Sequence, residues 1–305
     1  MSRHARKVAP HADHGAHTGA PVTHSAAARV ASLAIIFWLN QAHAGGNADD
    51  CEGPTVDCVA IGRWNFSVAL GAGVRTNPLV NGEDIPLVVI PQFSYYGKRF
   101  FIDNLDLGFT LAERGDNTFN LIATPGYDRV YFYRSDLQNL FLGFPNVSAA
   151  SRPILESPDT PGATKVSPPK PRITYLAGPE WTFKYGPVSG QLDLLRDATG
   201  QNSGDEIRGA LGTPLLKSKG TLSASIGFTW KSTATVNYYY RVPGFYSGSA
   251  AFDPFIRLGY TLPLSSKWRF NTFAEYERLG HGIADSPIVA EHSVATVFAG
   301  AIYAF

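Results

Sequence analysis

The sequence has few charged residues. Asp, Glu, Lys and Arg make up 17% of its 305 residues, below the ~25% of an average soluble domain. With a formal net charge of +1, the chain offers no strongly basic footprint, so nucleic acid is excluded as a partner. Disorder is excluded as well, because 44% of the residues are apolar and the net charge is close to zero.

Long apolar runs and catalytic motifs are also missing. After residue 44 no apolar run approaches the ~18 residues of a transmembrane helix, so helical membrane spans are excluded there. The sequence contains no nucleophile elbow, phosphate-binding loop or metal-ligand cluster. Most of the eight histidines precede residue 44, which leaves His281 and His292. We therefore expect no catalytic residue, cofactor or metal, and hence a protein that is not an enzyme.

The N-terminus has the three parts of a secretory signal peptide. Basic residues precede an apolar run at 30–39 that is too short to span a bilayer, and Ala42-His43-Ala44 is a small-x-small cleavage site. We expect residues 1–44 to be removed on export. The alternative is a retained anchor or a buried helix.

Export places residues 45–62 in an oxidising periplasm, as a segment ahead of the folded part of the chain. Cys51 and Cys58, the only cysteines, lie within this segment. Two cysteines so close together in an exported protein are typical of a small-loop disulfide. We predict a disulfide between them.

Alternation of apolar and polar residues begins at Trp64 and is cleanest at 221–230. A period of two is typical of a β-strand with one apolar face. The pattern, stronger in some segments than in others, predicts about twelve strands (10–14), at residues 64–74, 87–96, 100–111, 119–127, 173–185, 188–195, 205–215, 221–230, 233–241, 252–262, 267–277 and 292–305.

Two all-β folds fit this alternation: a soluble sandwich or lipocalin-like barrel, and an outer-membrane barrel whose apolar face contacts lipid. Most of the candidate strands approach or exceed the ~9–11 residues that cross a bilayer at a tilt, whereas ordinary strands peak at about 5–6. Aromatic residues such as Trp64, Tyr185 and Trp268 fall near strand ends, as girdles at membrane interfaces require. We predict a transmembrane antiparallel up-and-down β-barrel over residues 63–305, in contact with outer-membrane lipid.

Charges of both signs share one face of the predicted strand 267–277. Lys267, Arg269, Glu275 and Glu277 alternate with mostly apolar residues. Because the interior of a membrane barrel is polar, we expect these four side chains to face the lumen.

The chain ends with Gly300, Tyr303 and Phe305. This ending resembles the C-terminal assembly signal of outer-membrane barrels, in which Gly, an aromatic residue two from the end and a final Phe are read by the insertion machinery. Phe298 stands where a polar residue is usual. The resemblance implies the barrel-assembly machinery as a partner and the outer membrane of a Gram-negative cell as the location.

A long connection, residues 128–171, is rich in proline in its second half, which argues against strand pairing there. In its first half Ser135-Asp-Leu-Gln138 is a capping box, and apolar residues follow helical spacing: Leu137, Leu140, Phe141 and Phe144. Four candidate strands precede it, so we expect it on the periplasmic side with the termini, docking a partner or folding in as a plug. The alternatives are a tolerated insertion, or a missed strand that would place it outside.

Two parts of the chain resemble a known family. The first is residues 71–86, followed by Pro91 and the aromatic pairs at 95–96 and 100–101. The second comprises residues 262–270 and 276–280 and the most specific piece, Asp285-Ser-Pro-Ile-Val289. Both resemble the MltA-interacting protein (MipA/OmpV) family of outer-membrane barrels.

The resemblance implies a scaffold that brings a murein lytic transglycosylase together with a bifunctional peptidoglycan synthase. Other members of the family are linked to osmotic response and to solute or antibiotic entry. The alternative function is therefore a passive diffusion channel. About twelve strands would leave a lumen between those of filled eight-stranded barrels and open sixteen-stranded porins, so strand number does not decide between the two.

Overall fold

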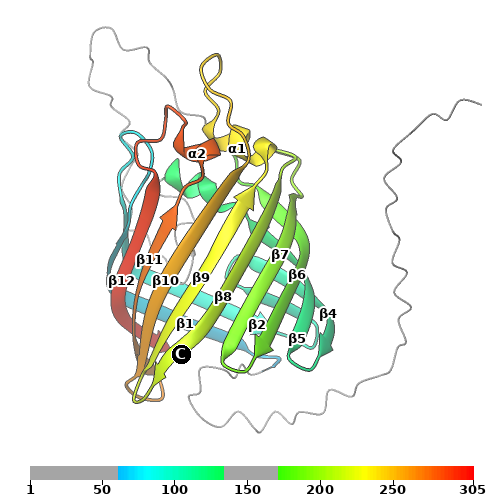
Figure 1. Ribbon diagram of the computed structural model, residues 1–305. Coiled ribbons are helices and arrows are strands. Elements are labelled where there is room, and N and C mark those ends of the chain that lie inside the picture. Colours follow the sequence, from blue (N-terminus) through cyan, green and yellow to red (C-terminus); the bar gives the residue numbers. More distant parts are fainter. Residues whose placement is uncertain (1–60, 134–170) are drawn as a thin grey trace, which may run out of the picture. The chain divides into compact units, whose positions relative to one another are not determined.

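The computed structural model describes residues 61–133 and 171–305, most of which lie in β-strands (Figure 1). The strands are β1 (Trp64–Arg75), β2 (Ile85–Tyr96), β3 (Phe100–Asp103), β4 (Asp106–Arg114), β5 (Asn117–Pro125), β6 (Tyr175–Tyr185), β7 (Val188–Asp197), β8 (Asp205–Lys217), β9 (Thr221–Lys231), β10 (Ala251–Pro263), β11 (Trp268–Arg278) and β12 (Ser293–Ala304). The helices are η1 (Tyr127–Tyr131, a 3-10 helix), α1 (Thr233–Tyr240) and α2 (His281–Ala284). None of these described helices is long and apolar enough to cross a membrane.

Three of the sequence predictions fall outside the described residues. They are the signal peptide at residues 1–44, the disulfide between Cys51 and Cys58 in the segment 45–62, and the helix in the 128–171 connection that would carry Leu137, Leu140, Phe141 and Phe144.

The strands close into a single barrel. Each strand pairs antiparallel with its neighbour in sequence, and β12 returns to pair with β1, where Gly71 lies opposite Gly300. This confirms the predicted antiparallel up-and-down β-barrel of about twelve strands.

Two of the predicted strands are wrong, but the errors cancel in the total number. The first error is at residues 100–111, which form two strands, the hairpin β3–β4, instead of one. Asn104 turns the chain with a φ of 53°, a left-handed conformation that Asn tolerates better than most residues. Its side-chain oxygen accepts a hydrogen bond from Phe93 N at 3.1 Å, and its own N–H donates to Phe93 O at 2.9 Å. These bonds hold the turn against β2.

The second error is at residues 233–241, where helix α1 replaces the predicted strand. Thr, Val and Tyr are enriched in strands, and the segment consists largely of these residues. The Ser232 side chain caps the helix by accepting a hydrogen bond from Thr235 N at 3.4 Å. The buried residues recur at helical spacing, so tertiary burial overrides strand propensity here: Thr235, Val236, Tyr239 and Tyr240.

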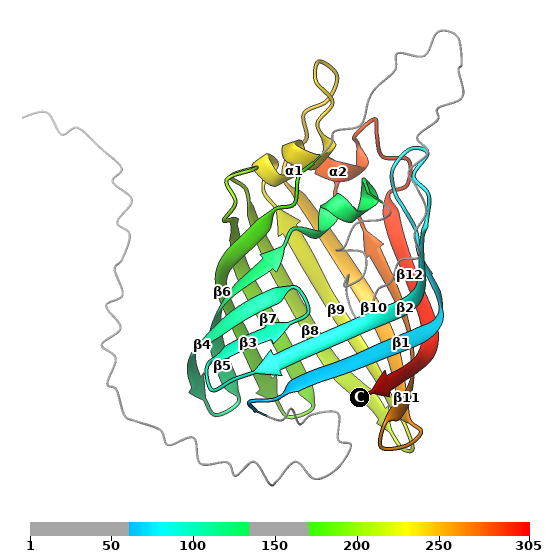
Figure 2. The ribbon, with the colours of Figure 1, turned by 180° about the vertical axis from the view of Figure 1, so that it is seen from behind.

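The extra strand of the hairpin moves the long connection to the other end of the barrel. Five strands precede the connection, so Pro125 and Tyr175 lie at the end opposite to Trp64 and Phe305. Figure 2 shows η1, which follows β5, at the end opposite to the C-terminus. We expected the 128–171 connection at the same end of the barrel as Trp64 and Phe305, and this expectation is wrong. The alternative, that one strand before the connection was missed, is correct.

The two ends of the barrel differ in their connections. At the end with Trp64 and Phe305, short turns join adjacent strands at residues 97–99, 115–116, 186–187, 218–220 and 264–267. The opposite end carries longer connections and the helices η1, α1 and α2 (Figure 1). Outer-membrane barrels have short periplasmic turns and longer extracellular loops. The end with Trp64 and Phe305 is therefore the periplasmic end.

Apolar side chains cover the outside of the wall. In β10, Phe252 and Ile256 are exposed, whereas Asp253 between them is buried on the inside. The other strands repeat this alternation, which is the two-residue period of a pleated strand. Large apolar side chains exposed in this way include Phe66, Leu70, Phe109, Leu121, Leu194, Leu211, Ile226, Leu258 and Val297. A continuous apolar exterior of this kind is the surface that a barrel presents to lipid.

Aromatic rings gather at the periplasmic ends of the strands. The ring centre of Trp64 lies 5.9 Å from that of Phe66 and 5.1 Å from that of Tyr95. Farther around the wall, the rings of Trp268 and Tyr303 lie 4.9 Å apart. Trp and Tyr combine an apolar ring with a polar group, which suits them to the membrane interface.

Glycine is required where β1 meets β12. The buried ring of Phe298 lies inside the barrel over both Gly71 and Gly300. A Cβ atom added at Gly71 would lie 2.7 Å from Phe298 Cζ, and one at Gly300 would lie 2.6 Å from it. Phe298 therefore fills the space that the two glycines leave, which explains an aromatic residue where a polar one is usual.

We expect the two ends of the barrel to react from opposite sides of the membrane. Phe245, in the α1–β10 connection, and Tyr185, at the periplasmic end of β6, are 69% and 82% exposed. With Cys51 and Cys58 replaced by Ser, Phe245→Cys should react with a membrane-impermeant maleimide on intact cells. Tyr185→Cys should react only after the outer membrane is permeabilised. The opposite pattern of labelling would invert the orientation.

Candidate functional site at the closed extracellular end of the lumen

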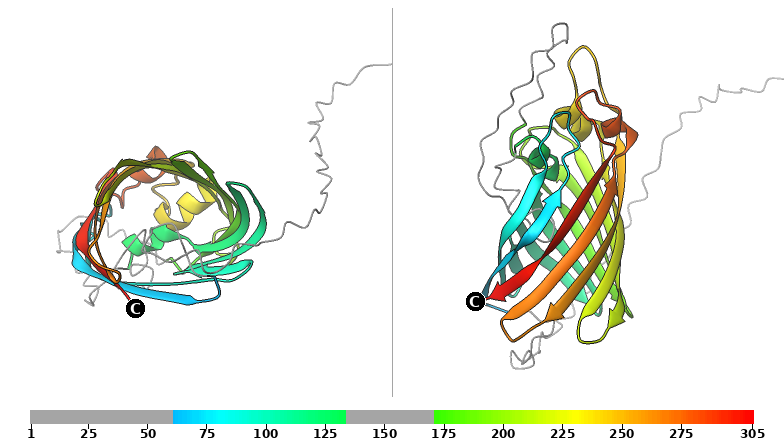
Figure 3. Two further views of the ribbon diagram at one scale, coloured as in Figure 1. Left: turned by 90° about the horizontal axis from the view of Figure 1, so that it is seen from below. Right: turned by 90° about the vertical axis from the view of Figure 1, so that its left-hand side faces the viewer.

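The extracellular end of the lumen is filled by the connections between strands. Figure 3 shows η1 and α1 inside the ring of strands when the barrel is viewed from below. Side chains from these helices, from α2 and from the 76–84 loop form one buried cluster with inward-facing residues of the strands. We call this cluster the luminal seal; its members include Leu79, Ile85, Val130, Tyr131, Val236, Tyr239, Tyr240, Ile283 and Ile288.

Aromatic side chains form the centre of the seal. The ring centre of Phe132 lies 6.2 Å from that of Tyr239 and 5.9 Å from that of Tyr240. The Tyr239 hydroxyl shares a hydrogen bond of 2.8 Å with the Thr174 hydroxyl, just before β6. Burial raises the pKa of both tyrosines above the ordinary value of a phenol. Their hydroxyls therefore stay protonated at neutral pH.

A buried ion triad fastens η1 to the wall. Lys231 Nζ, at the end of β9, lies 2.8 Å from Asp128 Oδ1 on η1 and 2.9 Å from Asp253 Oδ2 on β10. All three side chains are buried, and that of Asp253 is 0% exposed. The other oxygen of Asp253 accepts a hydrogen bond of 2.7 Å from Gly280 N, next to α2. One lysine and two carboxylates thus connect η1 and α2 to the same part of the wall.

Arg75 holds η1 from the opposite side, on β1. Its Nη2 donates a hydrogen bond of 2.6 Å to the Tyr131 hydroxyl and lies 3.4 Å from Glu277 Oε2. Its Nη1 lies 3.8 Å from Glu275 Oε1, and Arg257 Nη1 lies 3.3 Å from Glu275 Oε2. Burial is the main reason that the pKa of the Tyr131 phenol lies above its ordinary value. The phenol is therefore neutral, and Arg75 is balanced by the two glutamates.

A third cation, Arg208 on β8, contacts the chain where it enters η1. Its guanidinium pairs with Glu206 at 2.9 Å, donates to Pro125 O at 3.3 Å, and lies 5.1 Å from the centre of the Tyr127 ring. The helix η1 is therefore held by cations from three strands, β1, β8 and β9. Each of these cations has a carboxylate partner within the barrel.

The structure separates the four charges expected in the lumen. Glu275 and Glu277 lie inside the barrel and join the network around Arg75. Arg269 is on the same face of β11 but nearer the periplasmic end. Lys267 lies in the exposed β10–β11 turn, where its ammonium is 5.7 Å from the centre of the Tyr303 ring. These residues therefore do not form a single cluster.

Sequence reasoning missed the cations that hold the seal: Arg75, Arg208 and Lys231. A signal for them exists, because each is an ionisable residue within or at the end of a membrane strand, and such residues normally face the interior and pair there. The segment that they hold could not be found in this way, since Asp128 and Tyr131 lie in a part of the connection where the sequence shows neither strand nor helix periodicity.

The seal determines what the lumen can do. At this end, apolar side chains and paired charges occupy the space between the described walls. Movement of η1 away from the wall would separate Lys231 from Asp128 and Arg75 from Tyr131. Toward the periplasm the interior is lined by polar groups, such as Asn120, whose side chain donates to Glu180 at 2.7 Å.

A closed antiparallel barrel that is apolar outside and charged inside defines the class of the protein: it is a transmembrane β-barrel of the outer-membrane type. Residues 70–305 match the model of the family described as MltA-interacting protein MipA. The chain belongs to this family.

Several solved outer-membrane proteins are similar to this chain at low sequence identity. OmpT of Vibrio cholerae is 9% identical, with 79% of this chain and 97% of that chain covered and a TM-score of 0.35. An anion-selective porin from Comamonas acidovorans is 11% identical, with coverage of 80% and 99% and a TM-score of 0.33. OprG from Pseudomonas aeruginosa is 10% identical, with coverage of 80% and 93% and a TM-score of 0.20. No curated protein of similar sequence was found.

We expect the ion triad to be the most sensitive point of the seal. Lys231→Met removes the only cation within ion-pair distance of Asp128 and Asp253 among the described residues. Leaving buried carboxylates without their partner costs ~3–5 kcal/mol. The free energy of unfolding in urea, measured on protein folded into lipid vesicles, should fall by about this amount.

The control is Arg196→Gln. Arg196 pairs with Asp205 at 3.5 Å, but the side chains are 71% and 46% exposed, and exposed pairs contribute about 0–1 kcal/mol. Equal losses in the two variants would show that the triad does not hold the seal.

Proposed function

We propose that the protein is a non-catalytic barrel that anchors a peptidoglycan-remodelling enzyme, a murein lytic transglycosylase, at the periplasmic face of the outer membrane. A bifunctional peptidoglycan synthase would join the same assembly. The description of the family supports an interaction with MltA. The observation that carries the proposal is the luminal seal, because a barrel closed by paired charges at its outer end is better suited to anchoring than to diffusion.

The periplasmic rim supplies a surface for docking. Two acidic residues, Glu113 and Asp116, are exposed in or beside its turns, against a larger set of exposed basic residues. That set comprises Arg63, Lys98, Arg99, Arg114, Lys184, Lys217, Lys219 and Lys267. We call these eight residues the basic rim. A rim on which positive charges predominate attracts a partner of the opposite sign and orients it on encounter, so the partner's docking surface should be acidic.

Binding of the enzyme should depend on the basic rim. The test uses the barrel in nanodiscs of zwitterionic lipid and a purified lytic transglycosylase from the same cell. The wild type should bind it, and higher salt should weaken binding because surface charges are screened. A variant carrying Lys98→Glu, Arg99→Glu, Lys217→Glu and Lys219→Glu should bind roughly tenfold or more weakly.

The matched control is Arg241→Glu, which reverses an exposed charge at the extracellular end. It should leave binding of the enzyme unchanged. No binding by the wild type, or equal binding by the rim variant, would contradict docking at this surface.

Conductance separates the anchor from the alternative, a passive diffusion channel. We expect the purified barrel to show no sustained current in planar bilayers, because the seal occupies the outer end of the lumen. Brief openings should become more frequent in Lys231→Met, which releases Asp128 on η1. A sustained, solute-selective current in the wild type would replace the anchoring proposal with the channel.

A further inference from the structure

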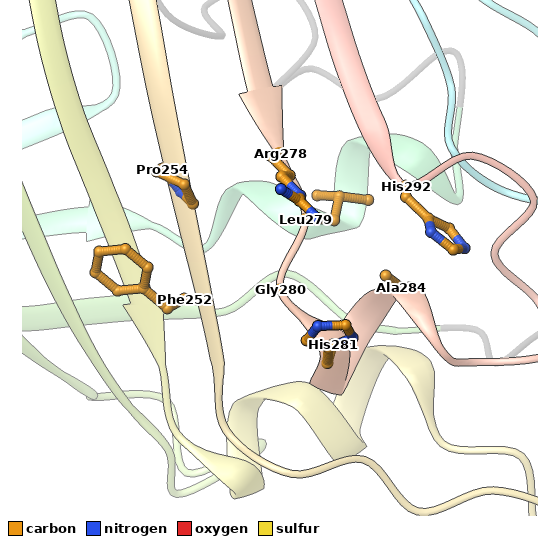
Figure 4. Close-up of a pocket in the computed structure, with 8 residues that line it drawn as sticks. All are labelled: Phe252, Pro254, Arg278, Leu279, Gly280, His281, Ala284 and His292. Atoms are coloured by element: carbon orange, nitrogen blue, oxygen red, sulfur yellow. The ribbon is translucent and has the colours of Figure 1, made fainter.

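A hollow of about 310 Å³ lies on the outside of the barrel at its extracellular end. It is lined by residues of β10, β11, α2 and the start of the chain leading into β12. Figure 4 shows the side chains of Arg278, His281 and His292 around it, with Phe252 and Pro254 on the β10 side. The only two histidines after residue 44 therefore line the same hollow as an arginine. We call this hollow the head pocket.

Arg278 differs from the cations inside the barrel. Among the described residues, its exposed guanidinium makes no hydrogen bond and no ion pair, whereas Arg75, Arg208 and Lys231 are all paired with carboxylates. His281 has a partner, Asp285, at 3.5 Å, with both side chains largely exposed. An unpaired cation in the same hollow as the exposed side chain of Phe252 is placed to bind an anion at the extracellular edge of the apolar wall.

A second hollow, of about 400 Å³, lies lower on the same outer face. Small residues form much of its lining, among them Ala72, Ala274 and Ala299. Leu258 and Val297 are exposed at its sides. The lining crosses the wall from β9 through β10, β11 and β12 to β1, over two rows of outward-facing residues, with small side chains between larger ones. We call this hollow the acyl groove.

The acyl groove lies directly below the head pocket. Both are lined by outward-facing residues of β10 and β11. One row of residues separates them, in which Tyr276 pairs with Ile256 and Ala295. Arg278 and Ala274 are four residues apart on β11, which is about 13 Å along a strand. A cationic pocket therefore lies at the edge of the lipid, and an apolar hollow lies below it, with one row of residues between them.

We propose that this outer face of β10–β12 binds a phosphorylated lipid of the outer leaflet, with its phosphate in the head pocket and an acyl chain in the acyl groove. Arg presents a planar fork of donors that matches phosphate oxygens. The groove selects a lipid over a free anion, since a free anion would leave the groove empty. In the outer leaflet of a Gram-negative outer membrane the lipid of this chemistry is lipid A, the anchor of lipopolysaccharide. This site is independent of docking at the periplasmic rim.

Native mass spectrometry of the full barrel in detergent tests the proposal, with bisphosphorylated lipid A as the probe. The wild type should retain one lipid A molecule. Arg278→Gln should bind it roughly tenfold or more weakly, because a charge-assisted hydrogen bond to phosphate is lost. Ala274→Phe, which fills the groove from an exposed position, should weaken binding of lipid A as well. The separate losses in the two variants would show that head pocket and groove act together.

Matched controls lie elsewhere on the wall. Arg196→Gln removes another exposed arginine at the extracellular end, and Ala177→Phe enlarges an outward-facing alanine on β6. Both should bind lipid A as the wild type does. Retained migration of the folded barrel on an unheated gel shows that each variant is folded, so that a loss of binding reports on the site.

Several outcomes would overturn the proposal. If dephosphorylated lipid A binds as tightly as bisphosphorylated lipid A, the head pocket does not recognise phosphate. Displacement of lipid A by inorganic phosphate alone would reduce the site to a free-anion site. A protein dimer that is lost in Ala274→Phe, without any effect on lipid A, would assign the groove to a second copy of this chain.

Discussion

The requirement that backbone N–H and C=O groups be paired within the bilayer governs this structure. Hydrocarbon offers them no partners, so a sheet that spans it must close on itself. Closure depends on the approach of β1 to β12, where Gly71 and Gly300 face one another and the Phe298 ring fills the space between them and the lumen. Once the wall is closed, each strand has an inner and an outer face. That division places Phe252 in lipid and its neighbour Asp253 in the interior.

Charged side chains inside the closed wall need partners, and the contacts of the luminal seal provide them. A charge in the interior lies in a low-dielectric setting and is costly without a partner. Lys231, Arg75 and Arg208 are balanced by carboxylates, and all three also contact η1 or the residues that lead into it. The interactions that stabilise these charges are therefore the same ones that close the outer end of the lumen. In the function proposed above, a barrel sealed in this way presents its outside wall and its basic rim to partners, and conduction through the lumen is not required.

Much of the fold could be predicted from local patterns, because the two-residue period of a strand is visible in sequence wherever one face is apolar. The segment 221–230 is the clearest case, and β9 spans Thr221–Lys231. The pattern was wrong where another force competed with it. At Asn104 a single residue with positive φ divides what looked like one strand, and at residues 233–241 burial in the seal selects a helix from strand-forming residues. The two errors left the strand count correct but placed the long connection at the wrong end.

The sequence by itself determined the class of fold, the outward apolar face and the family, since each depends on periodicity or on short motifs that are read along the chain. Only the tertiary structure decided from which end of the barrel the 128–171 connection leaves. That end depends on whether an odd or an even number of strands precedes the connection, and the β3–β4 hairpin changes the number from four to five. Only the structure likewise brought Lys231 to Asp128 and Asp253, and Arg278 into one hollow with His292. These residues lie on different elements. The distances between them are set by barrel closure, by the register of β9–β12 and by the position of η1 in the lumen, which no local pattern encodes.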